Sequence, residues 1–122
     1  MRRIAVVDDE PDITTVLKKG LEHHGFAVDV FNDPQAALDS FQPSHYDLMI
    51  VDIRMPKLNG FDLYRELKKR DENVRVCFLT AFEIYYDEFR KMFPTVDVRA
   101  FIRKPVSISN LVTQVNATIN SS

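Results

Sequence analysis

The stretch that decides the fold is Ile4-Ala5-Val6-Val7-Asp8-Asp9-Glu10, in which four apolar residues run directly into three acids. A short, continuous apolar run rich in β-branched residues is typical of a strand buried on both faces, as in a parallel sheet. The acids mark the point at which this strand meets solvent. The sequence therefore predicts a first strand that ends in carboxylates.

Four further short apolar runs predict strands. The four runs are residues 26–31, 46–51, 74–79 and 98–102. The run 46–51 leads to Asp52, the run 74–79 leads to Thr80, and the run 98–102 is followed closely by Lys104.

Apolar residues at helical spacing follow each predicted strand and indicate five helices. Gly25 is expected to end the first helix, Asn32-Asp33-Pro34 to begin the second, and Ser107 to cap the last. Strands that alternate with helices predict a doubly wound α/β fold with a five-stranded parallel sheet and five helices. The apolar face expected for the first helix carries Ile13, Val16, Leu17, Gly20 and Leu21.

The composition fits one globular domain. The chain has 122 residues, is 45% hydrophobic and carries a formal charge of -2, which gives no reason to expect direct binding to nucleic acid or to a membrane. The single cysteine, Cys77, is expected to be a buried structural thiol, and no apolar run approaches the ~20 residues of a membrane span. We expect one cytoplasmic domain over residues 1–122, with an ordered core at 1–119 and a tail or linker stub at 120–122.

Right-handed crossovers place the carboxyl ends of all parallel strands at one edge of the sheet. Asp8, Asp9, Asp52, Thr80 and Lys104 are therefore expected to converge there. Three carboxylates suit a hard cation such as Mg²⁺, and a lysine beside a hydroxyl suits an oxyanion. Any one of these acids alone is more simply a solvated loop residue. Their combination indicates phosphoryl chemistry.

These motifs resemble those of the receiver domains of two-component response regulators, and the resemblance spans nearly the whole chain. It implies the flavodoxin-like receiver fold and a phosphoacceptor signalling domain, which is not an enzyme and assists only its own phosphorylation and dephosphorylation. The matching segments are Val6-Val7-Asp8-Asp9-Glu10, Asp52-Ile53-Arg54-Met55-Pro56 with Asn59-Gly60, Leu79-Thr80-Ala81, and Lys104-Pro105.

The resemblance also implies roles for the acids. Asp52 would accept a phosphoryl group from a phosphohistidine on a sensor histidine kinase or phosphotransfer protein. Asp9, Asp52 and the backbone carbonyl of Arg54 would bind Mg²⁺ directly, and Asp8 would act mainly through a metal-bound water. Glu10 is expected to lie on the surface.

The remaining roles concern the phosphoryl group and the switch. By the same resemblance, Lys104 would neutralise phosphoryl charge, Thr80 would donate its hydroxyl to a phosphoryl oxygen, Phe101 would be the switch aromatic, and Pro105 would follow a cis peptide bond. The fourth helix, fifth strand and fifth helix would bind a target or a second copy after phosphorylation.

The segment from 82 to 101 departs from the receiver pattern, because Phe82 follows Ala81 where receivers have small residues, and residues 96–100 precede Phe101 where receivers have a Gly-Ala pair. An aromatic stripe also runs along the predicted fourth helix. This stripe is more simply the side that packs on the sheet, with a partner surface as the alternative. It consists of Phe82, Tyr85, Tyr86, Phe89 and Phe93.

Three other functions are compatible with parts of the sequence. A flavodoxin-like cofactor binder needs a first loop that cradles phosphate, whereas Asp8-Asp9-Glu10 repels it. A hydrolase of the haloacid type needs a second Asp two residues after the first, where this chain has Arg54. A degenerate receiver that acts as a phosphorylation-independent interaction module stays open because of the atypical segment, although the complete set of acids argues against it.

Overall fold

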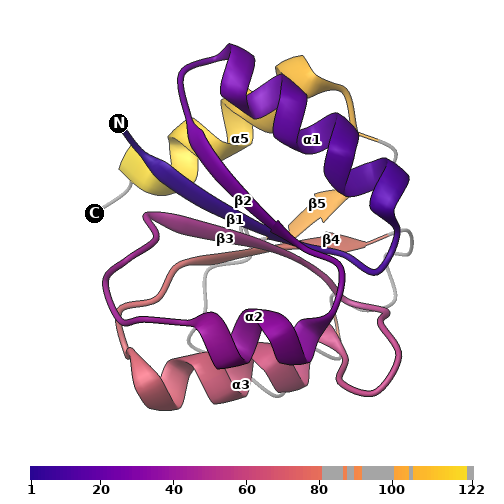
Figure 1. Cartoon of the computed structure of the whole chain (residues 1–122), viewed down its shortest axis with the longest axis vertical. Coiled ribbons are helices and arrows are strands. Elements are labelled where there is room, and N and C mark those ends of the chain that lie inside the picture. Colours follow the sequence, from indigo (N-terminus) through magenta and orange to yellow (C-terminus); the bar gives the residue numbers. More distant parts are fainter. Residues whose placement is uncertain (81–86, 88–89, 92–100, 105, 121–122) are drawn as a thin grey trace.

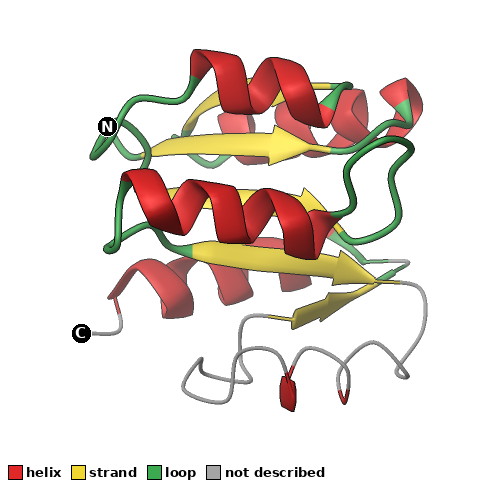
Figure 2. Ribbon diagram, turned by 90° about the horizontal axis from the view of Figure 1, so that it is seen from below, coloured by secondary structure: helices red, strands yellow, loops and turns green. Residues whose placement is uncertain are grey.

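The strands are β1 (Arg3–Val7), β2 (Ala27–Phe31), β3 (Leu48–Asp52), β4 (Val76–Thr80) and β5 (Phe101–Arg103). They form one sheet in the order β2-β1-β3-β4-β5, and every neighbouring pair is parallel. Figure 2 shows the strand arrows pointing the same way, so the strands end at a common edge. The computed structural model describes residues 1–80, 87, 90–91, 101–104 and 106–120.

Helices cover both faces of the sheet. They are α1 (Pro11–His23), α2 (Pro34–Ser40), α3 (Gly60–Arg70) and α5 (Ile108–Asn120). In Figure 1, α1 and α5 lie over one face, and α2 and α3 lie over the other. The predicted doubly wound fold is confirmed, with four of the five predicted helices inside the described residues. The aromatic stripe of the predicted fourth helix lies outside them, as does Pro105.

The first strand shows why its apolar run is continuous. Ile4 and Val6 point into the core beneath α1 and α5, whereas Ala5 and Val7 point into the core on the other face. All four side chains are 0% exposed. A strand enclosed in this way offers no polar face, which explains the absence of alternation.

The predicted helix boundaries are confirmed. Gly25 has a φ of +90°, a left-handed conformation that glycine adopts at no steric cost, just after α1. The Asp33 carboxylate accepts a hydrogen bond from the backbone N–H of Gln35 at 3.1 Å and caps α2. The Ser107 hydroxyl accepts one from the N–H of Asn110 at 3.1 Å at the start of α5.

The prediction for the buried face of α1 was wrong at one position. Val16 is 58% exposed, and Thr14 is buried in its place with 1% exposure. The reason is a polar contact, because the Thr14 hydroxyl meets the side chain of Asn32 at the end of β2. Hydrophobic spacing alone does not reveal such a contact.

In the described part of the chain, no helix combines the length and the hydropathy needed to span a bilayer.

Candidate functional site

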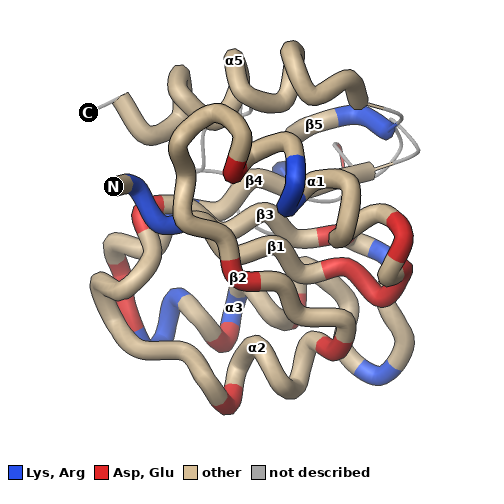
Figure 3. Tube along the Cα trace, turned by 45° about the horizontal axis from the view of Figure 1, so that its top comes forward, with Lys and Arg blue, Asp and Glu red and all other residues tan. Residues whose placement is uncertain are grey.

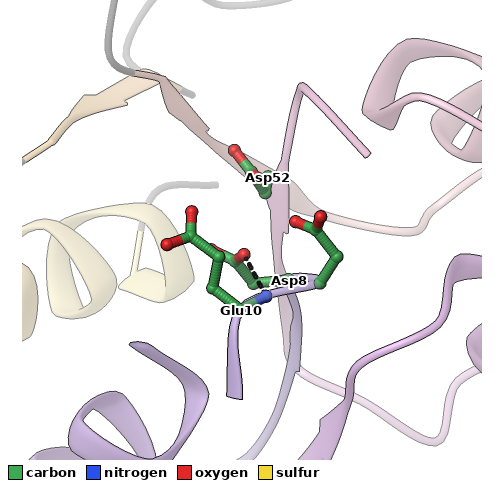
Figure 4. Close-up of side chains that lie close together, drawn as sticks. Asp8, Glu10 and Asp52 are labelled. Atoms are coloured by element: carbon green, nitrogen blue, oxygen red, sulfur yellow. Dashed lines mark hydrogen bonds between the residues drawn. The ribbon is translucent and has the colours of Figure 1, made fainter. Parts of the chain in front are cut away.

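The acids predicted to converge do lie together at the carboxyl edge of the sheet. Asp8, Asp9 and Glu10 follow β1, and Asp52 is the last residue of β3. One carboxylate oxygen from each of these four residues lies within 4.8 Å of the others. Figure 4 shows Asp8, Glu10 and Asp52 gathered at the strand ends, and Figure 3 shows acidic segments at this edge with a basic segment at the end of β5.

Lys104 neutralises part of this negative charge. Its Nζ lies 2.9 Å from Asp8 Oδ2, 3.4 Å from Asp52 Oδ1 and 3.9 Å from Glu10 Oε1. Burial alone lowers the pKa of the Lys104 ammonium, but the hydrogen bond to Asp8 and the charges of Asp52 and Asp8 outweigh it, so the pKa is raised. The ammonium therefore stays charged at the centre of the acids.

The strand ends fix the position of Lys104. Its backbone N–H donates to the carbonyl of Thr80 at 2.7 Å, directly after the last β4–β5 pair of residues. Thr80 itself is 7% exposed and is the last residue of β4. The lysine and the threonine thus reach the site from neighbouring strands, as predicted.

Asp8 is the most enclosed of the acids, with 0% exposure. Its Oδ1 accepts a hydrogen bond from the N–H of Glu10 at 3.0 Å, and its own N–H donates to the carbonyl of Phe31 at 3.1 Å. With Lys104 on Oδ2, both carboxylate oxygens have partners. Asp8 is therefore held in place by its backbone and its side chain together.

Asp52 is 6% exposed and sits among like charges. Burial, followed by the negative charge of Asp8, raises the pKa of Asp52 from 3.8 to about 6, against the opposing effect of Lys104. A carboxylate in this setting is ionised at neutral pH, but burial and the neighbouring negative charge make its ionised form less favourable than it is in water. It gains from any cation placed between it and the other acids.

The backbone around Asp52 is fixed by a contact that the motif analysis did not explain. A Cβ on Gly60 would lie 2.5 Å from the carbonyl oxygen of Asp52, so only glycine permits this approach. The Gly60 N–H donates to the carbonyl of Ile53 at 2.8 Å, and the Asn59 side chain caps α3 by accepting from the N–H of Asp62 at 2.9 Å. The start of α3 thus buttresses the end of β3.

A cavity of about 150 Å³ opens at this site. It is lined by three residues expected from the sequence to meet, Asp52, Thr80 and Lys104. Arg54, which is exposed, also lines it. Its lining residues are Glu10, Asp52, Ile53, Arg54, Thr80 and Lys104.

Glu10 and Phe101 differ in how closely they approach the site. Glu10 is exposed, as expected, yet its carboxylate belongs to the acid cluster, which the sequence analysis did not foresee. Phe101, at the start of β5, is half-buried. Its ring packs in the core between the sheet and helices α2 and α3, with its centroid 5.6 Å from that of Phe78. It does not line the cavity next to Asp52.

The donor set fits a hard divalent cation. All four cluster ligands are carboxylate oxygens, which Mg²⁺ prefers, and neither nitrogen nor sulfur donors occur among them. Asp8 and Asp52 are buried, so their negative charges are poorly solvated without a counter-ion. The site therefore suits Mg²⁺ on both chemical and electrostatic grounds.

Known proteins are similar to this chain in sequence and in fold. The chain is 29% identical over 120 residues to the transcriptional regulatory protein TrcR of Mycobacterium tuberculosis, a match that covers 98% of this chain and 46% of TrcR. The structure superposes on the non-phosphorylated HemR receiver domain of Leptospira biflexa with a TM-score of 0.86 and 27% identity, covering 100% of this chain and 97% of that receiver domain.

It also superposes on the response regulator TrrA of Thermotoga maritima, solved in complex with Mg²⁺-BeF, with a TM-score of 0.80 and 30% identity over 97% of this chain and 99% of TrrA. The chain spans about half the length of the curated relatives it matches. The family model of the response regulator receiver domain matches residues 4–116. With that match over most of its length, the chain belongs to the response regulator receiver domain family.

Proposed function

We propose that this domain is a phosphorylation-dependent switch of a two-component system, in which Asp52 accepts a phosphoryl group from a phosphohistidine. The proposal rests on one observation: a buried carboxylate, a lysine and a threonine line the same cavity. Asp52 Oδ1 lies 3.4 Å from Lys104 Nζ, and Thr80 lines the same space. The donor would be a sensor histidine kinase or a phosphotransfer protein.

The reaction is a displacement at phosphorus. A carboxylate oxygen of Asp52 attacks the phosphorus, the N–P bond of the phosphohistidine breaks, and its electron pair returns to the imidazole nitrogen, which takes up a proton. The incoming phosphoryl oxygens carry negative charge into a cluster that is already acidic. Lys104 offsets this charge from beside Asp52, and the Thr80 hydroxyl donates a hydrogen bond to a phosphoryl oxygen.

The residues proposed to hold Mg²⁺ are Asp9, Asp52 and the backbone carbonyl of Arg54, with Asp8 acting through a metal-bound water. When bound, the ion offsets the negative charges of the carboxylates and of the phosphoryl group, so that the two anions can approach. The Mg²⁺-BeF complex of TrrA, which has the same fold and is 30% identical, supports the proposal that this domain binds Mg²⁺. The all-oxygen donor set of the cluster supports it independently.

The output is proposed to be a change of partner surface. Phosphorylation would draw Thr80 toward Asp52 and let Phe101 turn inward, shifting the face formed by the predicted fourth helix, β5 and α5 toward a form that binds a target or a second copy. The longer relatives include a transcriptional regulatory protein, so an attached effector is a natural recipient of this change. A degenerate receiver is less well supported, because the acids, hydroxyl and lysine are all present.

Phosphoramidate, a small donor with an N–P bond, tests the proposal without a cognate kinase. The parent protein should gain one phosphoryl group with Mg²⁺, as measured by intact-protein mass spectrometry, and none in EDTA. Asp52→Asn should gain none, whereas Asp62→Asn, which changes a half-exposed acid on α3, should behave as the parent. An unmodified parent, or a modified Asp52→Asn variant, would overturn the assignment.

A further inference from the structure

We propose that Asn32 is a positioning residue whose side-chain amide clamps the acidic loop after β1 and thereby sets the affinity of the site for Mg²⁺. This inference rests on the proposed Mg²⁺ site. Asn32 lies directly after β2, on an element that contributes no acid to the cluster. It acts through the loop and not by touching the cation or the phosphoryl group.

The amide nitrogen of Asn32 uses both of its hydrogens on this loop. Nδ2 donates to the backbone carbonyl of Asp8 at 2.9 Å and to the hydroxyl of Thr14 at 2.9 Å. An amide nitrogen carries two N–H donors, so both are committed. The single side chain thus joins the two ends of the segment from residue 8 to residue 14.

Thr14 extends the clamp to the middle of the segment. Its hydroxyl accepts from Asn32 and donates to the carbonyl of Pro11 at 3.1 Å, and the side chain is 1% exposed. The loop is therefore fixed at residues 8, 11 and 14 by one continuous chain of hydrogen bonds. Asp9 and Glu10, which carry two of the four cluster carboxylates, lie between the first two of these points.

The hydrogen bonds of Asn32 do not have to break when a cation binds, whereas other contacts of the loop do. The second group of contacts on the loop uses the Asp8 carboxylate, which binds Lys104 and the N–H of Glu10. A cation entering the cluster competes for the oxygens of that carboxylate. The Asn32 contacts use only a carbonyl and a hydroxyl, so they hold the loop with or without the ion. A loop ordered in advance loses less entropy when it binds a ligand.

The geometry also explains the residue type. An aspartate at this position would direct an acceptor at the Asp8 carbonyl, which is itself an acceptor, and would add negative charge next to the acid cluster. An alanine would leave the carbonyl of Asp8 and the hydroxyl of Thr14 without this donor. Only a short side chain with two N–H groups meets both oxygens.

The test measures Mg²⁺ affinity by isothermal titration calorimetry. Asn32→Ala should bind Mg²⁺ roughly tenfold more weakly than the parent, a typical loss when a partner of a ligand-bearing group is removed. Thr14→Val, which keeps the shape but removes the hydroxyl, should show a loss in the same direction, and Thr14→Ser should restore the parent affinity.

Asp33→Ala is the matched control. It removes the neighbouring cap of α2, so it should lower the melting temperature while leaving the Mg²⁺ affinity unchanged. A second readout needs no metal, because hydrogen exchange of the Glu10 amide in EDTA should quicken in Asn32→Ala and not in Asp33→Ala. This amide donates to the Asp8 carboxylate and reports the order of the loop directly.

The outcomes separate the clamp from the metal site. Parent-like affinity and parent-like exchange in Asn32→Ala would overturn the clamp. A parent protein that fails to bind Mg²⁺ would overturn the metal site and the effect on affinity together, and exchange would then show whether Asn32 orders the loop. An affinity loss in Asp33→Ala as large as in Asn32→Ala would reduce the effect to general destabilisation and refute the inference.

Discussion

Replacing Asp52 by Asn should stabilise the metal-free protein, and the gain should depend on pH. The pKa of Asp52 is raised from 3.8 to about 6, first by burial and then by the charge of Asp8. The folded state therefore binds a proton more tightly than the unfolded state does. As pH rises from 3.8 toward 6, the unfolded state loses this proton while the folded state still holds it, so stability falls over that window and stays lower above it.

The magnitude follows from the shift. A shift of about two units corresponds to roughly 3 kcal/mol at neutral pH, from about 1.4 kcal/mol per unit. Small movements of the acidic side chains relieve part of the repulsion, so we expect Asp52→Asn to be more stable than the parent by about 2 kcal/mol near pH 7.5. Near pH 5 the advantage should shrink to about half, because the folded parent is then largely protonated at Asp52.

Urea unfolding in EDTA at the two pH values measures this directly. Mg²⁺ should stabilise the parent, since the ion binds only the folded state, and should stabilise Asp52→Asn much less. An Asp52→Asn variant that is no more stable than the parent near pH 7.5, or an advantage that does not change with pH, would refute the view that repulsion around Asp52 destabilises the site.

Three further predictions concern Lys104 and Gly60 at the site and Cys77 in the core. Lys104→Met should lower the metal-free stability by about 2 kcal/mol, because it leaves the buried carboxylate of Asp8 without its cation, and urea unfolding that matches the parent would contradict this. Gly60→Ala should lower stability by ~1–3 kcal/mol through the clash with the carbonyl of Asp52, so an unchanged melting temperature would count against that contact. Cys77 is 0% exposed, and burial raises the pKa of its thiol, so it should react with Ellman's reagent only on unfolding; rapid labelling of the native protein would show that the strand opens.

The sequence predicted most of the fold because buried parallel strands leave a clear pattern. The apolar run at β1 and its acids predicted both the strand and its carboxyl end, and the confirmed caps at Asp33 and Ser107 are local signals that need no tertiary information. The convergence of Asp52, Thr80 and Lys104 followed from the handedness of the crossovers.

What the sequence did not predict depends on contacts between distant segments. The burial of Thr14 in place of Val16 results from a hydrogen bond to Asn32, eighteen residues away in the chain. The closeness of Gly60 to Asp52 depends on how α3 meets the end of β3. The participation of Glu10 in the acid cluster depends on its closeness to Asp52 and Lys104, which come from distant parts of the chain. None of these leaves a periodic pattern.

We propose that Asp52, and no other acid of the cluster, forms the bond to the phosphoryl group. The most direct measurement is borohydride reduction of the phosphoramidate-treated protein, followed by peptide mapping, because borohydride converts an aspartyl phosphate into homoserine. Homoserine is expected at position 52, formed only in the presence of Mg²⁺. Homoserine at Asp8 or Asp9, or at no position despite phosphoryl incorporation, would contradict this proposal.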